Sequence, residues 1–533
     1  MVGNFMNIVL DINIVLDLLL QRGPDYPAQV ALFDRLRATG AKLWFPACAL
    51  PSLEYVHYQE IRRLSQIGRL TTPSSPAALS RQQLDLFLGS LNLLSSYGFH
   101  WRQIPLGHPD REDALISLAA ASLPGKTVIW TGDRTFHSAV PDLPVLDHAG
   151  LANYLDQQAS SSRTVPFIDL AVQQLTLRES LEQGLTTVLK HGSYIMGPEI
   201  KALEARLAEY VGVKHAITCS SGTDALLIPL MAYGVGPGDA IFTTPFTFIA
   251  TAEVIQLLGA TPVFVDIDPR TFNLDPTSLA QAIADLDNHP RTRGLRPKGI
   301  IPVDLFGQPA DYDQINAIAR QHGLFVLEDA AQSFGATYKG RRAGALADVG
   351  ATSFFPAKPL GGYGDGGAIF TDHDDLAAAM RSIRVHGQGT HKYDNVRVGV
   401  NGRLDTLQAA IVLAKLDIFD QEVLDRQRVA QRYSAALPEK VTVPFVAPEC
   451  TSVWAQYSVL SDQREELQAK LKAAGVPTAI YYPLPLHLQG AFAHLGHQPG
   501  DFPHSEAAAR RIFSLPMHPY LDAQTQEYIC AAL

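Results

Sequence analysis

One lysine stands in a setting where its amine could act as a nucleophile. Lys358 lies within TSFFPAKPLGGYGDGG, residues 352–367, a stretch rich in aromatic residues and glycines. Burial in such surroundings lowers the pKa of a lysine and makes the neutral amine available to form a Schiff base with a carbonyl compound. The ordinary alternative is a surface lysine whose alkyl stem packs against Phe355. Taken alone, the motif leaves both interpretations open.

Two further motifs offer groups that such a site needs. In CSSGTDAL, residues 219–226, an apolar strand runs into a glycine turn and a helix, and the free N–H groups of a helix N-terminus can bind phosphate. In VLEDAAQSFG, residues 326–335, Asp329 ends a strongly apolar strand. Ligands of α/β sheets bind at the carboxyl ends of the strands. Both motifs can equally be a helix cap and a capping acid.

A fourth segment, VGVNGRLDTLQAAI at residues 398–411, places Asn401 and Arg403 directly before an amphipathic helix. The arginine is either a cation for an anionic ligand or a solvent-facing residue at a helix start. The order of all four motifs along the chain is far more specific than any one of them.

Together these motifs resemble those of the DegT/StrS-type nucleotide-sugar aminotransferases, which use pyridoxal 5'-phosphate on the aspartate-aminotransferase-like scaffold (fold type I). The resemblance covers nearly all of residues 165–533. It implies that Lys358 binds the cofactor covalently and that Asp329 pairs with its pyridine nitrogen, so that these two residues are catalytic. The other residues that it implies for cofactor binding are Gly222, Thr223, Phe248, Gln332, Ser353 and Asn401.

The resemblance also implies a reaction and an assembly. Some relatives replace the lysine with histidine and act as dehydratases, so Lys358 favours transamination in this chain. Asn401, together with Arg403, would reach the site from a second subunit, which makes a homodimer the minimal active unit.

A finer resemblance is to family members that move an amino group from L-glutamate to the 3-keto group of a UDP-linked 2-acetamido uronic acid. Those enzymes serve bacterial surface polysaccharide, such as lipopolysaccharide O-antigen. An anionic uronate needs a cationic partner, and Arg403 is the candidate because a guanidinium can bind a carboxylate through two hydrogen bonds. Arg403 could instead bind the carboxylate of glutamate, or serve both. His386 and Tyr482 are further candidates for substrate binding, with packing as the alternative.

Residues 1–155 carry a different set of polar groups. Several carboxylates that meet at the carboxyl end of a sheet can hold Mg²⁺ or Mn²⁺, which can activate water to cleave a phosphodiester. As a set, this segment resembles a PIN domain, the ribonuclease module of many bacterial toxins. The expected metal ligands are Asp11, Glu54, Asp113 and Asp133, with Asp110 as an alternative and Asn13 as an assisting residue.

Two observations count against nuclease activity in this segment. Ile12 stands where relatives often have Thr or Ser, which removes a hydroxyl that could orient the first carboxylate. The segment also lacks the strong positive charge that is expected of a dedicated RNA-binding surface. One alternative remains for the whole chain, a ribonuclease whose transferase part is a dimerising scaffold. Another is a regulatory protein that senses the sugar pathway.

The elements that must position these groups follow an alternation of strands and helices in both parts. This order predicts an α/β fold: a PIN-like parallel α/β/α domain, then a large domain and a smaller C-terminal α+β domain. A polar, serine-rich stretch, DQQASSSRT, predicts a linker between the parts. The expected boundaries are 1–155, a linker at 156–164, 165–415 for the cofactor-binding large domain and 416–533 for the small domain.

Composition limits the classes of function. The chain has 533 residues and a net charge of −10, which argues against a protein that coats nucleic acid, although RNA stays a candidate partner of the first segment. The four cysteines are scattered and favour neither a disulfide scaffold nor a zinc site. The apolar N-terminal run is broken by Asp11 and Asp17 and resembles neither a signal peptide nor a membrane span. A cytoplasmic enzyme is expected.

Overall fold

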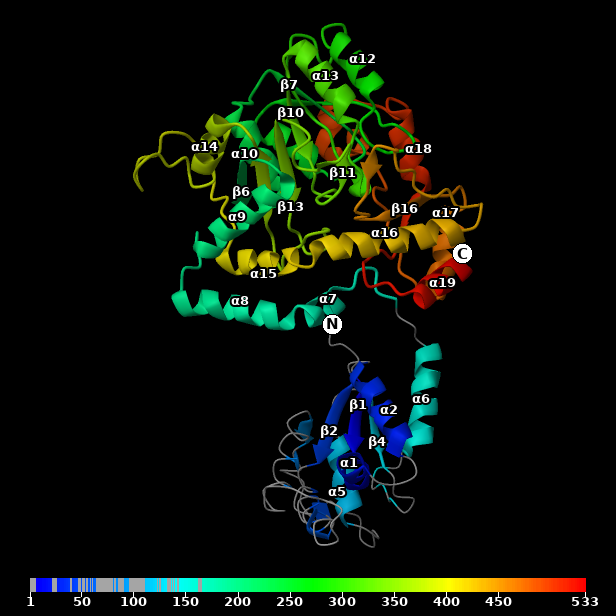
Figure 1. Ribbon diagram of the computed structural model, residues 1–533. Coiled ribbons are helices and arrows are strands. Elements are labelled where there is room, and N and C mark those ends of the chain that lie inside the picture. Colours follow the sequence, from blue (N-terminus) through cyan, green and yellow to red (C-terminus); the bar gives the residue numbers. More distant parts are fainter. Residues whose placement is uncertain are drawn as a thin grey trace. The chain divides into compact units, whose positions relative to one another are not determined.

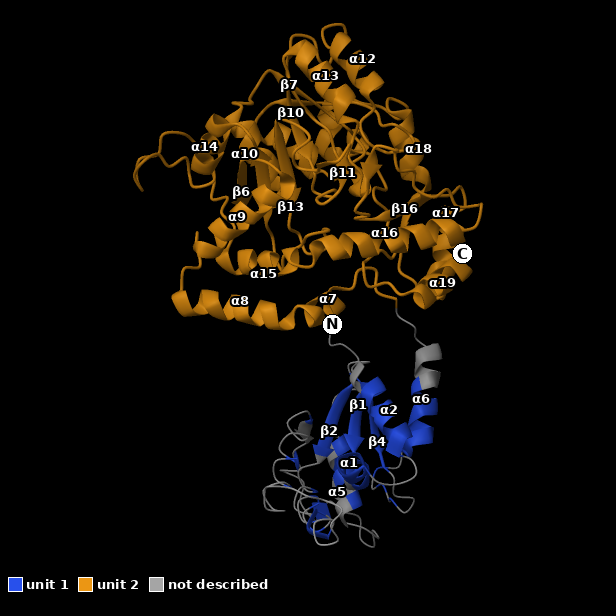
Figure 2. Ribbon diagram, viewed as in Figure 1, with its two compact units in different colours: residues 1–163 blue, residues 164–533 orange. Residues whose placement is uncertain are grey.

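The computed structural model divides into two compact units, residues 1–163 and 164–533, which are described separately below (Figures 1 and 2). The second unit is described almost throughout, from residue 165 to 533. Of the first unit, the structure describes residues 6–21, 26–38, 41–46, 91–94, 111–121, 126–131 and 143–161, with scattered single positions between these ranges.

The first unit is built around a parallel sheet. Its strands lie in the order β3-β2-β1-β4-β5, and every pairing between them is parallel. Strand β1 is buried at all four residues, as expected for a central strand covered on both faces. The strands are β1 (Asn7–Leu10), β2 (Lys42–Pro46), β3 (Asn92–Leu94), β4 (Thr127–Trp130) and β5 (Val145–Leu146). The expected parallel α/β sheet is therefore present, and its assignment to the PIN domains stays a prediction.

The helices of this unit enclose an apolar core around β1. Leu36, Phe45 and Trp130 are among its buried side chains. The helices are α1 (Ile12–Leu20), α2 (Tyr26–Ala38), α5 (Arg111–Ala121) and α6 (His148–Ser161).

Helix α6 corrects the expected linker. Residues 156–161, read as linker from their serine-rich sequence, form the last turns of this helix. The helix packs two leucines, Leu151 and Leu155, into the core of the unit. Tertiary packing at its start stabilises the helix, and the Asp, Gln, Ala and Ser residues that follow are compatible with further turns.

The second unit is centred on a mixed sheet with the strand order β6-β14-β13-β10-β9-β7-β8. All neighbours are parallel except β14, which runs antiparallel to both β6 and β13. The strands are β6 (His215–Cys219), β7 (Asp239–Thr243), β8 (Thr261–Phe264), β9 (Arg296–Ile301), β10 (Phe325–Asp329), β13 (Val349–Ser353) and β14 (Gly367–Thr371).

Helices cover both faces of this sheet. Successive side chains of a strand point to opposite faces, so Ile241 and Phe242 of β7 belong to two different cores. One core contains residues of α10 (Gly222–Ala232), α11 (Ala250–Leu257) and α14 (Asp374–Ile383), and the other contains residues of α12 (Pro276–Ala284) and α13 (Tyr312–His322). The sequence predicts a large α/β sheet for this part, and the antiparallel direction of β14 is added by the structure.

Four further helices frame the edge of the unit that Figure 1 shows at its bottom. Helix α15 (Thr406–Leu416) packs against both α8 (Arg178–His191) and α9 (Pro198–Val211). The short helix α7 (Leu170–Thr176) precedes α8, and its N-cap, Asp169, accepts hydrogen bonds from the N–H groups of Ala171 and Val172.

The C-terminal residues form a smaller α+β portion with its own core. Tyr433, Val459, Phe513 and Ile529 are fully buried there. Its elements are α16 (Phe419–Ala436), β16 (Tyr457–Leu460), α17 (Arg464–Ala473), η4 (Leu486–Leu488), η5 (Gly490–Leu495), α18 (Pro503–Arg511), β17 (Ile512–Leu515) and α19 (Ala523–Ala531). A small three-stranded sheet joins β15 (Cys450–Thr451) to β11 (Thr337–Tyr338) and β12 (Arg341–Arg342). The expected boundary between residues 415 and 416 stays a prediction.

In the described part of the chain, no helix has the length and apolarity needed to cross a membrane.

Candidate active site

Three strands bring the sequence motifs to one edge of the large sheet. Strands β6, β10 and β13 run in the same direction, and they end at Cys219, Asp329 and Ser353. The carboxyl ends of strands that run in one direction lie at the same edge, which is where α/β sheets bind their ligands. Groups more than a hundred residues apart in sequence therefore face one region.

The first component is a close contact between Gly222 and Ser353. A Cβ atom on Gly222 would lie 2.6 Å from the Cβ of Ser353 and 2.9 Å from its Oγ, so only glycine fits there. Gly222 is the first residue of α10, and the side chain of its N-cap, Ser221, accepts a hydrogen bond from the N–H of Asp224. The N–H groups of Gly222 and Thr223 belong to the open first turn of the helix, where an anion is favoured.

The second component is the carboxylate of Asp329, which is buried at the end of β10. Burial raises its pKa, while hydrogen bonds from the hydroxyl of Thr251 and the N–H of Ala331, and the nearby charge of Lys358, act in the opposite direction. The Thr251 Oγ1 lies 2.8 Å from Asp329 Oδ2, and the Ala331 nitrogen lies 3.2 Å from Oδ1. Both carboxylate oxygens are thus held by donors of the protein.

The third component is the amine of Lys358, on the loop that follows β13. Burial lowers its pKa, and the attraction of Asp329 partly offsets that shift. Because β10 and β13 are parallel neighbours, Asp329 and the loop that carries Lys358 lie at the same edge of the sheet. The structure therefore brings together the two residues on which the sequence-based hypothesis depends most.

The fourth component joins Gln332 to Tyr482. Gln332 Oε1 accepts a hydrogen bond from the N–H of Phe306 at 2.8 Å, and its Nε2 donates to the hydroxyl of Tyr482 at 3.2 Å. Burial raises the pKa of Tyr482 well above its usual value, so the phenol stays protonated. The small C-terminal portion thereby contributes a hydroxyl beside the Asp329 segment.

Asn401 and Arg403 share one segment of chain, and His386 lies beside that segment. The N–H of Ser220 donates to the carbonyl of Gly402 at 3.1 Å, which places Asn401 and Arg403 beside the α10 turn of their own chain. The side chain of Asn401 is exposed, and His386 lies alongside it, where its N–H donates to the carbonyl of Val400. The buried Nε of Arg403 has no hydrogen-bond partner among the residues described.

Phe248 precedes α11, the helix that contributes Thr251, and its side chain is half-exposed. Its carbonyl accepts a hydrogen bond from the N–H of Thr251, whose hydroxyl binds Asp329. The expected stacking role of this ring stays a prediction.

These residues fit pyridoxal phosphate. The first turn of α10 and Ser353 form a cradle that leaves no room for a Cβ at Gly222, as a phosphate site requires. Asp329 supplies a buried carboxylate for a protonated ring nitrogen, and Lys358 supplies an amine whose pKa is lowered by burial. The described chain thus offers a partner for the phosphate, the ring and the aldehyde.

Two side chains important for this geometry were missed from the sequence. Thr251 was not singled out, although a threonine at the start of an otherwise apolar helix, four residues after Thr247, is a usable signal. Gln408, within the sequence LQAA of α15, contacts the loop of Lys358 through its side-chain amide. Its position in an ordinary amphipathic pattern gave no sign of that contact.

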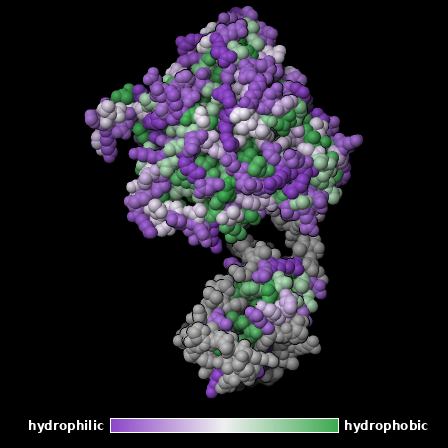
Figure 3. Space-filling model, in the orientation of Figure 1, coloured by the Kyte–Doolittle hydropathy of each residue, from purple (hydrophilic) through white to green (hydrophobic). Residues whose placement is uncertain are grey.

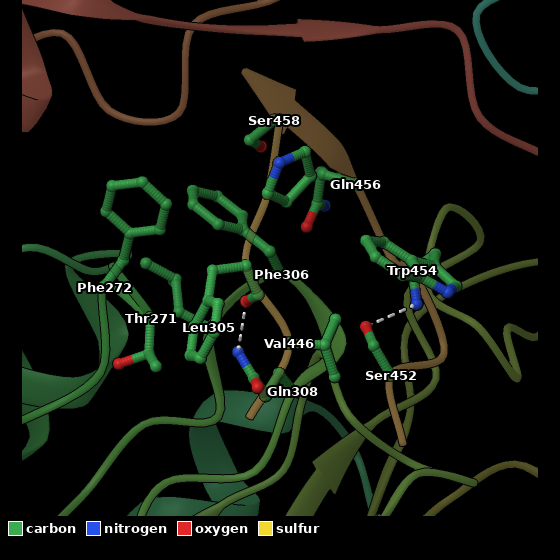
Figure 4. A pocket seen from close by; sticks show the side chains of 12 residues that line it. Thr271, Phe272, Leu305, Phe306, Gln308, Val446, Ser452, Trp454, Gln456 and Ser458 are labelled. Atoms are coloured by element: carbon green, nitrogen blue, oxygen red, sulfur yellow. Dashed lines mark hydrogen bonds between the residues drawn. The ribbon is translucent and has the colours of Figure 1, made fainter. Parts of the chain in front are cut away.

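A small cavity is lined by none of the candidate site residues (Figure 4). It has a volume of about 20 Å³, enough for one water molecule. Phe306, whose N–H holds Gln332, forms part of its wall together with Gln308 and Trp454. The cavity is too small for a sugar and belongs to the packing between the large domain and the C-terminal portion.

The expected metal ligands of the first unit are described only in part. Asp11 is buried directly after β1, and its Oδ2 accepts hydrogen bonds from the hydroxyl of Thr131 at 2.7 Å and the amide of Asn13 at 3.3 Å. Asp113 lies in α5. Glu54, Asp133 and the alternative Asp110 lie outside the described residues. Among the described residues, no group of three or more His, Cys, Asp or Glu side chains is arranged to hold a metal ion.

Comparison with known proteins supports the aminotransferase hypothesis. A curated relative is 55% identical over 370 residues, which cover 69% of this chain and 99% of the relative; it is a UDP-2-acetamido-2-deoxy-3-oxo-D-glucuronate aminotransferase from Pseudomonas aeruginosa. A second relative, a UDP-N-acetyl-3-dehydro-alpha-D-glucosamine 3-aminotransferase from Acidithiobacillus ferrooxidans, is 39% identical and covers 68% of this chain and 95% of its own.

Solved structures agree with these relatives. A DegT/DnrJ/EryC1/StrS aminotransferase from Brucella abortus is 50% identical, with a TM-score of 0.67, over 69% of this chain and 98% of its own. The structure of NtdA from Bacillus subtilis with the bound cofactor PMP is 29% identical, with a TM-score of 0.63, over 74% of this chain and 93% of its own. The model of the DegT/DnrJ/EryC1/StrS aminotransferase family matches residues 176–533, and the chain therefore belongs to this family.

Proposed function

We propose that this aminotransferase moves an amino group from L-glutamate to the 3-keto group of a UDP-linked 2-acetamido uronic acid. The 55% identity to the Pseudomonas aeruginosa enzyme, which is named for such a substrate, carries the proposal. The relative from Acidithiobacillus ferrooxidans is named for a 3-keto sugar without a carboxylate, so the family alone does not select the uronic acid. We also propose that the enzyme acts in the cytoplasm, in the synthesis of surface polysaccharide.

Arg403 is the candidate cation for a substrate carboxylate. Its Nε is buried and lacks a hydrogen-bond partner in the described chain, and a buried donor without a partner is costly. A substrate carboxylate would satisfy that donor. The carboxylate of the sugar and that of glutamate are both suitable, and the two half-reactions present them in turn.

Each of the other residues has a separate role in this proposal. Gly222, Thr223 and Ser353 bind the phosphate of pyridoxal phosphate, and Gln332 and Asn401 contact the cofactor further. Pyridoxal phosphate supplies an electron sink that stabilises the carbanion formed next to the transferred nitrogen. Asp329 would keep the ring nitrogen protonated, and Phe248 would stack on the ring.

Lys358 is the base of the reaction. Because burial lowers the pKa of its amine, a neutral amine is available near neutral pH to take a proton from the substrate carbon and return it to the cofactor side. The attraction of Asp329 raises the pKa of the amine and so favours its ammonium form after each proton transfer. Tyr482 and His386 face the substrate in this proposal and orient the sugar.

We also propose that two copies form the active enzyme. Several apolar side chains near the site are about half-exposed in the single chain, and apolar atoms are visible among polar ones on its surface (Figure 3). Exposed apolar groups around a site favour coverage by a partner. Three segments contribute them: Tyr194 to Met196, whose backbone bonds to Thr406, then Phe248, and Phe355 next to Ser353.

An amino-transfer assay tests the proposed substrate. The full chain is mixed with L-glutamate and either the UDP-linked 3-keto uronic acid or the matching 3-keto sugar that carries a hydroxymethyl group. We expect the uronic acid to be preferred, and Arg403→Gln to reduce that preference by about 10- to 100-fold, the value of a charged hydrogen bond. Equal rates with both sugars contradict the acidic substrate. A rise only in the KM for glutamate assigns Arg403 to the donor instead.

Covalent loading tests the assignment of Lys358. Borohydride reduction of the yellow protein should fix the cofactor on Lys358, and Lys358→Ala should carry no adduct. A colourless protein that ignores added pyridoxal phosphate contradicts the assignment.

For the first unit we propose a separate PIN-like, metal-dependent ribonuclease activity, with Asp11, Glu54, Asp113 and Asp133 as ligands. The buried carboxylate of Asp11, at the carboxyl end of a central parallel strand, is the observation that favours it. The full chain should cleave single-stranded RNA with Mn²⁺, and Asp11→Ala should abolish cleavage while amino transfer continues. Absence of both cleavage and divalent-metal binding contradicts this activity.

A further inference from the structure

The loop that carries Lys358 is closed at its base by the sheet. Strands β13 and β14 pair in antiparallel register, with Ser353 opposite Gly367, so residues 354–366 form a single excursion from the sheet. Backbone hydrogen bonds fold the loop back on itself: the N–H of Lys358 donates to Phe355 O at 2.8 Å, and the N–H of Gly362 donates to Phe354 O at 2.7 Å. The half of the loop before the lysine is thereby held by the half after it.

A side chain of helix α15 forms a hydrogen bond with the second half of this loop. Gln408 lies in the first turn of α15, and its Oε1 accepts a hydrogen bond from the N–H of Tyr363 at 2.8 Å. The loop N–H would otherwise lack a secondary-structure partner, because β14 starts only at Gly367. The side-chain amide of Gln408 thus supplies the hydrogen-bond acceptor that a neighbouring strand would otherwise supply.

Two glycines of the sequence GGYGDGG lie close to the Gln408 amide. A Cβ on Gly362 would lie 2.8 Å from Gln408 Oε1, and a Cβ on Gly364 would lie 2.9 Å from Gln408 Nε2. Neither glycine has a left-handed backbone, so an L-residue could adopt either conformation. A Cβ at either position would displace the amide at the end of the Gln408 side chain, and that displacement would cost the hydrogen bond to the Tyr363 N–H.

Helix α15 holds Tyr363 at a second point. Lys415 lies seven residues after Gln408, which is close to two helical turns and therefore on the same face of the helix. Its Nζ lies 4.1 Å from the centre of the Tyr363 ring, a cation–π distance. Burial lowers the pKa of this amine to about 8, with Glu422 opposing the shift. The backbone and ring of Tyr363 are thus both fixed to one helix.

The same helix also follows the segment of Asn401 and Arg403. Leu404 of that segment reaches Gly366, where a Cβ would lie 2.8 Å from its Cδ1. The start of α15 therefore contacts the lysine loop and directly follows the segment of Asn401 and Arg403, which the expected dimer would present to the site of the second subunit. Any shift of the helix moves both.

We propose that Gln408 is a positioning residue for Lys358: its side-chain amide, inserted between Gly362 and Gly364, sets where the loop presents the reactive amine and couples that position to the Asn401 and Arg403 segment. This rests on the proposed role of Lys358. Gln408 itself contacts the loop and not the substrate, so it acts through the lysine.

The first test replaces the amide and compares activity with spectra. Gln408→Leu keeps the size and removes the acceptor, Gln408→Glu keeps an acceptor for the Tyr363 N–H, and Gln421→Leu on the exposed face of α16 is the matched control. We expect Gln408→Leu to lower kcat about tenfold, with little change in the KM for glutamate. We also expect it to shift the pH at which the absorbance of the lysine-bound cofactor changes. Gln408→Glu should restore most of both, and Gln421→Leu should alter neither.

The second test needs no cofactor. Gly364→Ala should lower the melting temperature of the cofactor-free protein, because its Cβ meets Gln408. In Gly364→Ala combined with Gln408→Ala the loss should be smaller than the sum of the single losses, since the shortened side chain leaves room. A Gly490→Ala control should change nothing, because in the described chain no atom comes within 4 Å of a Cβ there.

The outcomes separate this proposal from the proposed function. Wild-type kcat and an unshifted absorbance transition in Gln408→Leu overturn it, as does a lower melting temperature with unchanged kcat. Additive losses in the double variant also overturn it. If Lys358→Ala still shows the cofactor bound covalently, the role of the lysine fails instead, and the test on the cofactor-free protein still reports on the contact between Gln408 and Gly364.

Discussion

The hydroxyl of Thr251 donates a hydrogen bond to Asp329 Oδ2 at 2.8 Å, and this contact joins the first turn of α11 to the end of β10. It gives a buried carboxylate a donor from the protein, so Asp329 can stay ionised at a position where burial alone raises its pKa. Thr247 Oγ1 lies 3.2 Å from Thr251 Oγ1 and extends the chain of hydroxyls.

The ionised carboxylate of Asp329 is the form that would hold the ring nitrogen protonated. Removal of the Thr251 hydroxyl should therefore make that ionised form less stable. In Thr251→Val the pKa of Asp329 rises further, and we expect kcat to fall by about 10- to 100-fold, the effect of one hydrogen bond to a charged group. Steady-state amino transfer from glutamate measures this. Thr251→Ser, which keeps the hydroxyl, should remain within a few-fold of the wild type, and equal activity of the valine variant would refute the role.

The cradle at the start of α10 should not tolerate a methyl group. In Gly222→Ala the new Cβ would lie 2.6 Å from the Cβ of Ser353, so the turn must open and the phosphate contacts weaken. We expect the Kd for pyridoxal phosphate, measured by fluorescence titration, to rise at least tenfold, about 1.4 kcal/mol. Gly490→Ala, in an exposed position with free space around it, should bind the cofactor as the wild type does.

Tyr482 should have a smaller effect. Its hydroxyl accepts one hydrogen bond from Gln332, which is also held by the N–H of Phe306. Because Gln332 keeps that second partner, Tyr482→Phe should reduce kcat/KM for the sugar by only about two- to tenfold. A larger loss would mean that the hydroxyl contacts the reacting groups directly.

His518 predicts a pH dependence of stability. Burial lowers its pKa to about 4, and its surroundings include Asp169, Asp522 and the cation of Arg426. The unfolded chain binds a proton near pH 6.5 while the folded chain stays neutral, so stability is retained above pH 6.5 and falls as the pH drops toward 4. The loss is at most about 1.4 kcal/mol per pH unit.

Thermal unfolding at several pH values measures this effect. The melting temperature of His518→Gln should fall less steeply than that of the wild type between pH 6.5 and pH 4, because glutamine takes up no proton. Parallel curves for the two proteins would show that His518 is not the titrating group.

The sequence predicts the main chemistry of the site because the chemistry requires particular residue types. The apolar strand that ends at Asp329 and the glycine turn before Thr223 are local patterns, and both are present in the structure. The pairing of Gly222 with Ser353 is a contact across the sheet, and local pattern does not reveal which strands are neighbours.

The antiparallel strand β14 shows a second limit. The alternation of strands and helices predicts a large α/β sheet here but does not fix the strand directions. The connection between β13 and β14 contains no helix, and the two strands pair as a hairpin. Two parallel neighbours need a crossover connection, usually a helix. The glycine-rich loop after Lys358 disfavours a helix, so it already indicates an antiparallel pair. In helix α6 the local sequence misleads instead. Its serine-rich end predicts a linker, but the structure continues the helix there, and packing at Leu155 stabilises it.

The hairpin connection has a consequence for motion. Both ends of the Lys358 loop are anchored in interior strands, since β13 and β14 lie between β6 and β10 rather than at an edge. Fraying of either edge strand, β8 or β6, leaves the pairing of β13 with β14 in place, and the amide protons of these two strands should exchange slowly with solvent. The loop that carries the reactive amine is thus anchored in the part of the fold that we expect to open last.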